Sequence, residues 1–183
     1  VIRAFLPALG AALERLGGRL GAVVWRLSPY YRLEMETTAP DRALIRQQFE
    51  LAASHRLHVP TLSAEQNRTL FGKCNNPKGH GHNYRVEPCV EVPVGEGTAA
   101  GFGLADLERI TQRVLISRFD HTHLNEDMPE FSSRTGVNPS VENIAQVFFR
   151  LLAPAIKAEA GQAATLRSLT VWETDKTAAT YPA

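Results

Sequence analysis

Two patterns of apolar residues alternate along the 183-residue chain and predict strands and helices. The strand-like stretches are residues 43–54, 80–92 and 166–174, and we expect a short strand around residues 99–103. Helical spacing of apolar residues predicts helices over residues 104–119 and about 141–158. Ser63 with Gln66 three positions later is a capping box, which predicts a short helix through Leu70. This element order indicates an antiparallel α+β fold.

Three local features refine these elements. Pro88 and Pro93 fall in the strand 80–92, and because proline removes a backbone donor we expect an edge or a bulge there. Glu173 shares one face of the last strand with Leu169 and Val171, so a carboxylate lies in phase with buried positions. Ser140 can cap the second long helix, whose predicted apolar stripe is Val141, Ile144, Ala145, Phe148, Leu152 and Ile156.

Residues 1–42 differ from the rest, and we interpret them as an N-terminal extension ahead of a domain of residues 43–183. Glu14 is the only acid among the first 33 residues, which are rich in Leu, Ala, Gly and Arg. Such a stretch indicates an accessory helix or upstream sequence that is not part of the mature protein, and an organelle transit peptide, for which serine is scarce here, is the alternative. Its apolar runs are too short to span a membrane. No internal repeat or low-complexity tract is apparent.

Composition and charge narrow the class of protein. The chain is 44% hydrophobic and 21% charged, as in ordinary soluble globular proteins. A formal net charge of +1, without a dense basic run, argues against broad nucleic-acid binding. Cys74 and Cys89 are too few for a disulfide framework in a chain of this size. A reduced compartment, the cytoplasm, is therefore expected.

The segment from Cys74 to His82 carries the strongest chemical signal. His80 and His82 are two residues apart in a predicted strand, so both imidazoles face the same side. With His55 they would supply three nitrogens to Zn²⁺ and leave one position open, as in catalytic zinc sites. Cys74 is either a fourth ligand that closes a structural site or an uncoordinated base. The spacing leaves both interpretations open.

Further carboxylates and histidines are candidates for proton transfer and binding. Asp120 and His121 follow the first long helix, where a carboxylate can orient an imidazole that exchanges protons. A helix-end cap is the alternative. Glu142 lies in the first turn after Ser140, where it would also stabilise the helix dipole. Glu173 could accept two parallel N–H bonds from a flat amidine-like ligand edge.

The run from Phe71 to Tyr84 closely resembles the 6-pyruvoyl-tetrahydropterin synthase family. The resemblance covers about residues 43–177. Other segments resemble this family in the same order: Ala53–Leu57, Leu104–Leu107, Phe119–His121, Pro139–Asn143 and Trp172–Asp175.

The resemblance implies a tunnelling fold, in which a four-stranded antiparallel sheet carries two long helices on one face. Trimers would close a barrel, and two trimers would stack into a homohexamer. The implied zinc ligands are His55, His80 and His82, with Cys74 as the proton-abstracting base. Sites in this family form between subunits.

The resemblance also assigns the remaining candidates. Asp120 and His121 would assist proton relay, and Glu173 would hold the amino-pyrimidine edge of a pterin. Ser140 and Glu142 would lie beside that substrate. Mg²⁺ would accompany a triphosphate group.

The implied reaction converts 7,8-dihydroneopterin triphosphate to 6-pyruvoyl-tetrahydropterin with loss of triphosphate, a step of tetrahydrobiopterin biosynthesis. The alternative is 6-carboxytetrahydropterin synthase of queuosine biosynthesis. Five residues, Asn75 to Gly79, separate the cysteine from His80, which favours the pyruvoyl enzymes. A zinc-stabilised pterin-binding protein without catalysis is a third hypothesis. Gly103 departs from the family pattern, which usually has Asn or Asp before Leu-Ala-Asp-Leu.

Overall fold

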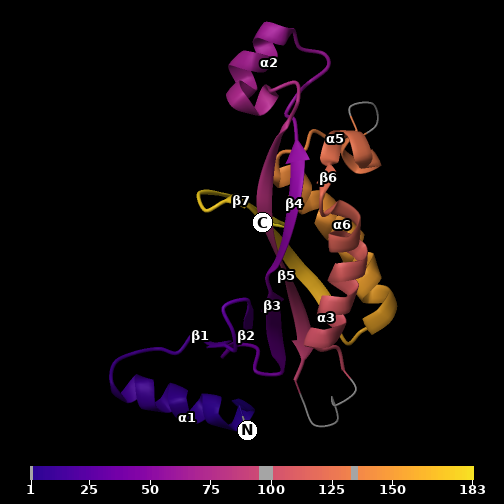
Figure 1. The fold of residues 1–183 in the computed structure, drawn as a ribbon. Coiled ribbons are helices and arrows are strands. Elements are labelled where there is room, and N and C mark those ends of the chain that lie inside the picture. Colours follow the sequence, from indigo (N-terminus) through magenta and orange to yellow (C-terminus); the bar gives the residue numbers. More distant parts are fainter. Residues whose placement is uncertain (1, 95–100, 133–135) are drawn as a thin grey trace.

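Strand β5 (His80–Pro93) is the longest strand and the centre of the sheet. The computed structural model describes residues 2–94, 101–132 and 136–183, and within them the mixed sheet has eight strands (Figure 1). One edge of β5 pairs antiparallel with β4 (Phe49–His55) and then β3 (Arg42–Gln47), and the other edge pairs with β7 (Thr165–Thr174).

Four shorter strands extend this centre. Strand β8 (Thr177–Tyr181) pairs antiparallel with β7, and β6 (Thr122–His123) runs parallel to the end of β4. The N-terminal strands β1 (Ala22–Arg26) and β2 (Tyr31–Glu36) form a hairpin, and β2 pairs with β3. Part of the predicted extension therefore joins the same sheet.

Two long helical segments cover one face of the sheet (Figure 1). The first is continuous from α3 (Leu104–Thr111) through a π turn, η3 (Gln112–Ile116), to α4 (Ser117–Phe119). The second is α6 (Val141–Ala160), which packs on β7 and β8. The remaining helices are short or peripheral: α1 (Ile2–Arg15), α2 (Ala64–Phe71), η1 (Gly72–Asn75), α5 (Leu124–Asp127) and η4 (Pro129–Phe131). None of the described helices is long and apolar enough to cross a membrane.

The predicted helix signals are confirmed. The Ser63–Gln66 capping box is present at α2, and Ser140 Oγ accepts the Asn143 N–H at the start of α6. Burial of the α6 stripe supplies most of its stabilisation, since isolated helices of this length are marginal. The Phe148 ring packs 4.8 Å from that of Phe119. All six predicted stripe residues are buried, namely Val141, Ile144, Ala145, Phe148, Leu152 and Ile156.

Several predicted strands need correction. The described sheet has eight strands rather than four. The stretch 43–54 is two strands, because the Gln48 N–H donates to the Tyr30 carbonyl, 2.8 Å away, between β3 and β4. Residues 101–103 form no strand, and 95–100 lie outside the described residues. β7 is not the last strand, because β8 follows it, and β6, α5 and η4 lie between the two long helices.

The proline-containing strand is central rather than an edge. Its predicted bulge is confirmed, because the pairing of β5 with β7 shifts register between Cys89 and Val90. On the other side, Val86 faces Phe49 and Cys89 faces Arg46, so Pro88 lies opposite the break between β3 and β4. Proline is tolerated there because that part of the ladder requires no donor from β5.

Candidate metal centre and active site

Three imidazoles and one carboxylate converge where β4 ends and β5 begins. His55 pairs directly with His80, and Ala53 pairs with His82, so all three rings reach the same face of the sheet. The Nε2 atoms of His55 and His80 are 3.0 Å apart. Glu173 Oε1, from β7, lies 3.2 Å from His55 Nε2 and 3.4 Å from His82 Nε2. One ligand atom from each of these residues lies within 4.8 Å of those of the others.

The orientation of His55 is fixed by a backbone group. Its fully buried ring places Nδ1 2.7 Å from the carbonyl oxygen of Pro139. A carbonyl can only accept, so Nδ1 carries the proton and donates it. Nε2 then presents its lone pair to the cluster, which is the usual arrangement behind a metal-bound histidine. Pro139 directly precedes the Ser140 cap, so the start of α6 is tied to the centre.

The cluster fits a tetrahedral metal ion. Ligand atoms at about 2.0–2.1 Å from such an ion are roughly 3.3–3.4 Å apart, close to the three separations above. His82 Nε2, which faces the cluster, is buried and has no hydrogen-bond partner in the described structure. A metal ion would satisfy an imidazole nitrogen that protein groups leave unpaired. Three imidazole nitrogens, with the fourth position taken by a carboxylate or a substrate oxygen, suit Zn²⁺ among the common ions.

Protonation in the cluster also favours metal binding. Burial, followed by the neighbouring histidines, lowers the pKa of His80 below its ordinary 6.5. Burial likewise lowers the pKa of His82, although Glu173 opposes this shift. The adjacent His55 side chain, ahead of the other histidines, lowers the pKa of Glu173. Neutral imidazoles and an ionised carboxylate are the forms that bind a metal ion.

Cys74 lies outside this group of four. It is half-buried in η1 and lines a cavity of about 670 Å³ that His80 also lines. Its backbone carbonyl accepts the Leu57 N–H, which ties η1 to the segment after β4. The structure thus brings Glu173, and not Cys74, to the three imidazoles. The thiol thus lies beside the centre, in the cavity that His80 also lines.

Gly79 is required by a close approach between two segments of the site. Its φ is +72°, and a Cβ atom there would lie 2.7 Å from Nε2 of His123 and 3.0 Å from the carbonyl oxygen of His55. Only glycine adopts this conformation without strain and leaves that space. The start of β5 can therefore lie directly against the end of β4 and β6.

Asp120 and His121 form a contact at the other edge of β4. Asp120 Oδ2 is 2.9 Å from His121 Nδ1, and Asp120 Oδ1 accepts the Ala52 N–H at 2.8 Å, which lowers the pKa of this carboxyl group. His121 has a φ of +59°, unusual for a residue with a side chain, and its ring is largely exposed. Its N–H donates to the Ala52 carbonyl, which holds this conformation.

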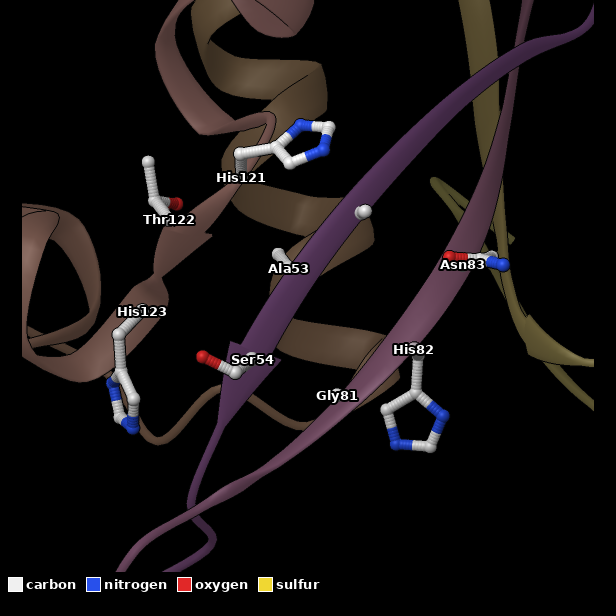
Figure 2. Close-up of a pocket in the computed structure, with 9 residues that line it drawn as sticks. Ala53, Ser54, Gly81, His82, Asn83, His121, Thr122 and His123 are labelled. Atoms are coloured by element: carbon white, nitrogen blue, oxygen red, sulfur yellow. The ribbon is translucent and has the colours of Figure 1, made fainter.

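The Asp120–His121 pair does not share the Cys74 cavity. His121 lines a separate open cleft of about 460 Å³ with His82 and His123, and Figure 2 shows that the His82 ring does not point toward His121. Ser140 and Glu142 lie at the start of α6, next to Pro139, with Glu142 exposed. Within a single chain, the three histidines therefore converge with Glu173. The other candidates lie outside this group of four, namely Cys74, Asp120, His121, Ser140 and Glu142.

Comparison with known proteins identifies the family. Residues 44–183 match the family model described as 6-pyruvoyl tetrahydropterin synthase. The chain belongs to this family. The 6-pyruvoyl tetrahydrobiopterin synthase of Poecilia reticulata is 36% identical over 130 residues, which are 71% of this chain and 83% of the relative. That of Homo sapiens is 34% identical over 140 residues, 76% of this chain and 91% of the relative.

A solved structure supports the same assignment. The 6-pyruvoyl tetrahydropterin synthase of Caenorhabditis elegans matches with a TM-score of 0.66 and 30% identity, over 76% of this chain and 94% of that one. An uncharacterized protein of Wolinella succinogenes shares the fold, with a TM-score of 0.54 at 17% identity over 76% of this chain and 97% of that one. The family match leaves α1, β1 and β2 outside it.

Sequence reasoning missed several groups of this synthase-family site. Arg56, Arg68 and Lys73 line the cavity with Cys74, and their spacing in the sequence gives no signal. The Pro139 carbonyl that orients His55 is a backbone group and is invisible in a side-chain motif. Tyr84 is another such group, and its buried hydroxyl has no partner in the described structure. Burial raises the Tyr84 pKa, so this hydroxyl stays protonated.

Proposed function

We propose that this family member converts 7,8-dihydroneopterin triphosphate to 6-pyruvoyl-tetrahydropterin with elimination of triphosphate, as a zinc-dependent phosphorus–oxygen lyase. The convergence of His55, His80 and His82 beside the Cys74 cavity carries the proposal. Family membership and relatives named 6-pyruvoyl tetrahydrobiopterin synthase support it. The pathway would be tetrahydrobiopterin biosynthesis, and the compartment the cytoplasm.

The three histidines would hold Zn²⁺, which when bound lowers the pKa of substrate hydroxyls and stabilises negative charge on their oxygens. His55 is fixed for this role by the Pro139 carbonyl. Cys74, as a thiolate, would take a proton from a side-chain carbon of the substrate. The electron pair left on that carbon expels triphosphate, so no external oxidant or reductant is needed.

Glu173, with Ser140 and Glu142 nearby, would orient the pterin. An ionised carboxylate can accept two parallel N–H bonds from the amino-pyrimidine edge. Low pKa and partial burial suit Glu173 to this role, because it stays charged in a site that excludes much of the solvent. Asp120 and His121 would relay protons, and since they lie outside the Cys74 cavity we assign them to the site of an adjacent subunit.

Three cations in the Cys74 cavity fit the triphosphate. Arg56, Arg68 and Lys73 line it together with the base, and guanidinium and ammonium groups are the usual partners of phosphate oxygens. Mg²⁺ would accompany the same group. We expect Lys73→Glu to raise the KM for the triphosphate substrate about ten- to hundredfold, since charged hydrogen bonds contribute about 1.5–3 kcal/mol. Lys157→Glu, at the far end of α6, makes the same charge change and leaves KM unaltered.

Product analysis tests the proposal. Purified protein is incubated with 7,8-dihydroneopterin triphosphate, and the pterin product is identified by mass spectrometry while triphosphate is quantified. We expect 6-pyruvoyl-tetrahydropterin and one equivalent of triphosphate. A 6-carboxy product with acetaldehyde would instead identify a 6-carboxytetrahydropterin synthase. Pterin binding without triphosphate release would identify a non-catalytic binding protein.

The assembly implied by the resemblance, a hexamer of two stacked trimeric barrels, would bring the adjacent-subunit groups to each site. It requires sheets of neighbouring copies to join edge to edge. Light scattering of the active enzyme measures this state directly.

A further inference from the structure

The N-terminal unit α1–β1–β2 repeats the architecture of the C-terminal unit α6–β7–β8. In both, a helix leads into an antiparallel hairpin (Figure 1). Trp25 pairs with Leu33 as Val171 pairs with Ala179, and Val23 pairs with Met35 as Leu169 pairs with Tyr181. Each residue of the N-terminal pairs lies 146 positions before its counterpart in the C-terminal pairs. The two hairpins therefore have the same register and loop length over these pairs.

The helices of the two units share a rarer feature. Each contains an internal proline followed by alanine, at Pro7 and at Pro154. Proline inside a helix is unfavourable, so its presence in both supports a common origin. The sequence showed no internal repeat because few residues are identical, and the expectation that none exists is wrong at the level of structure. The family match, which begins at residue 44, does not include the N-terminal copy.

The two copies differ in what their outer strand pairs with. The second strand of the N-terminal copy, β2, pairs with β3, from Tyr31 opposite Gln47 to Glu34 opposite Leu44. Its counterpart β8 pairs, within the described residues, with β7 alone. An open strand edge can accept another strand, because its backbone N–H and C=O groups are unpaired. The contact between β2 and β3 thus shows within one chain how an α–β–β unit fits the β3 edge.

Two features attach the N-terminal copy to that edge. Leu6, Met35 and Ala43 form a small buried cluster between the copy and β3. On the opposite face, Arg32 Nη2 lies 2.5 Å from the carboxylate of Glu87, which is only 3% exposed. The position equivalent to Arg32 in β8 is Ala178, which offers Glu87 no charge. Such a buried carboxylate is stabilised by a paired guanidinium, so the N-terminal copy has the better fit.

The N-terminal copy has no catalytic equivalent. The position that corresponds to Glu173 is Leu27, which is exposed and cannot bind a metal ion or a pterin edge. The copy therefore retains the edge contact without the chemistry. We propose that α1–β1–β2 occupies the docking surface for α6–β7–β8 of a second copy of this chain, and that the two units compete for β3. A ring built through β3 and β8 would require the N-terminal copy to leave.

If the two units compete for β3, the register in which β8 of a second chain pairs with β3 can be predicted. If β8 of a second chain replaces β2, Ala179 lies opposite Ile45, and Thr180 opposite Leu44. Ala179 and Ile45 then both face the helix-covered side, as Leu33 and Ile45 do now. A shift by one residue would turn every β8 side chain to the wrong face. The register is therefore a specific, measurable consequence.

A lock and a release variant test the competition. In Glu34→Cys/Leu44→Cys, oxidation fixes β2 on β3 in their present pairing. In Met35→Asp, a charge in the buried cluster displaces the copy without altering residues 44–183. By light scattering we expect one chain, 20.2 kDa, for the oxidised lock, and a mass at least twofold higher for Met35→Asp at equal concentration. Unchanged metal content shows that the released variant is folded.

Cross-linking tests the register in the released background. Met35→Asp/Leu44→Cys/Thr180→Cys should form an intermolecular disulfide on oxidation. Met35→Asp/Leu44→Cys/Ala179→Cys, whose new thiol faces the other side of the sheet, should form at least tenfold less. Met35→Asp alone controls for the native cysteines. The proposal is overturned if the oxidised lock reaches the mass of the released variant, if folded Met35→Asp stays at one chain, or if both cysteine pairs cross-link equally.

Discussion

Replacing Cys74 by alanine distinguishes two roles for this residue, that of a catalytic base and that of a metal ligand. Cys74 is half-buried, and its thiol is not among the four groups that converge at the centre. Removing one sulfur atom from such a position should cost roughly 1 kcal/mol of the free energy of unfolding, comparable to a small truncation in a core. The fold and the metal content should therefore stay intact. Loss of a general base lowers turnover by about 10²–10⁴, equivalent to roughly 3–5 kcal/mol in the barrier.

The assay measures metal per chain by elemental mass spectrometry and triphosphate release by ion chromatography, on the same preparation. Cys89→Ala is the matched control, because Cys89 is buried in β5 away from the centre. That variant should keep its kcat, even where its stability falls. Loss of the metal ion from Cys74→Ala, in parallel with loss of turnover, would refute the reasoning and identify Cys74 as a ligand that closes the site.

Three further outcomes follow from the geometry. Glu173→Gln should retain the metal ion and raise the pterin KM at least tenfold; a loss of metal would make Glu173 a ligand instead. The pKa values of His80 and His82 are lowered in the folded chain, so near and below their ordinary 6.5 the unfolded chain binds more protons than the folded one. The free energy of unfolding of the metal-free protein, measured by urea titration, should therefore fall from pH 7.5 to pH 5.5. Phe148→Ala should lower the free energy of unfolding by about 3–5 kcal/mol in the same assay, and an effect below 1 kcal/mol would contradict its place in the core.

The strongest periodic patterns in the sequence were sufficient to predict the elements at the centre of the fold. The α6 stripe was predicted residue by residue, because helical periodicity fixes which side of a long helix is buried. The convergence of His80 and His82 followed from their alternation on one strand. His55 was included through its motif, and direct pairing of His55 with His80 explains why it meets them.

Weak local signals account for the missing strands. The residues of β8, Thr177–Tyr181, are mostly small and carry no apolar pattern, and β6 has two residues. Strand β2, Tyr31–Glu36, does alternate between apolar and polar residues, but its Arg-rich surroundings favoured interpretation as a leader. The break at Gln48 depends on a bond to Tyr30, a tertiary contact that no local pattern reveals.

Long-range register limited the prediction of the site. Glu173 was expected on a buried face, but its meeting with the histidines depends on how β7 pairs with β5, where Trp172 lies opposite Arg85. No residue pattern specifies that pairing. The Pro139 carbonyl could not be anticipated either, because its role comes from the path of the backbone before α6.

The glycine at position 79 links two parts of the molecule that would otherwise vary independently. Since its missing side chain makes room for the His123 ring, any larger residue there must displace either that ring or the backbone carbonyl of His55 at the end of β4. Substitution at one of these places should thus be tolerated in evolution only together with a compensating change at the other. Covariation of this pair across relatives would be the expected trace of that constraint.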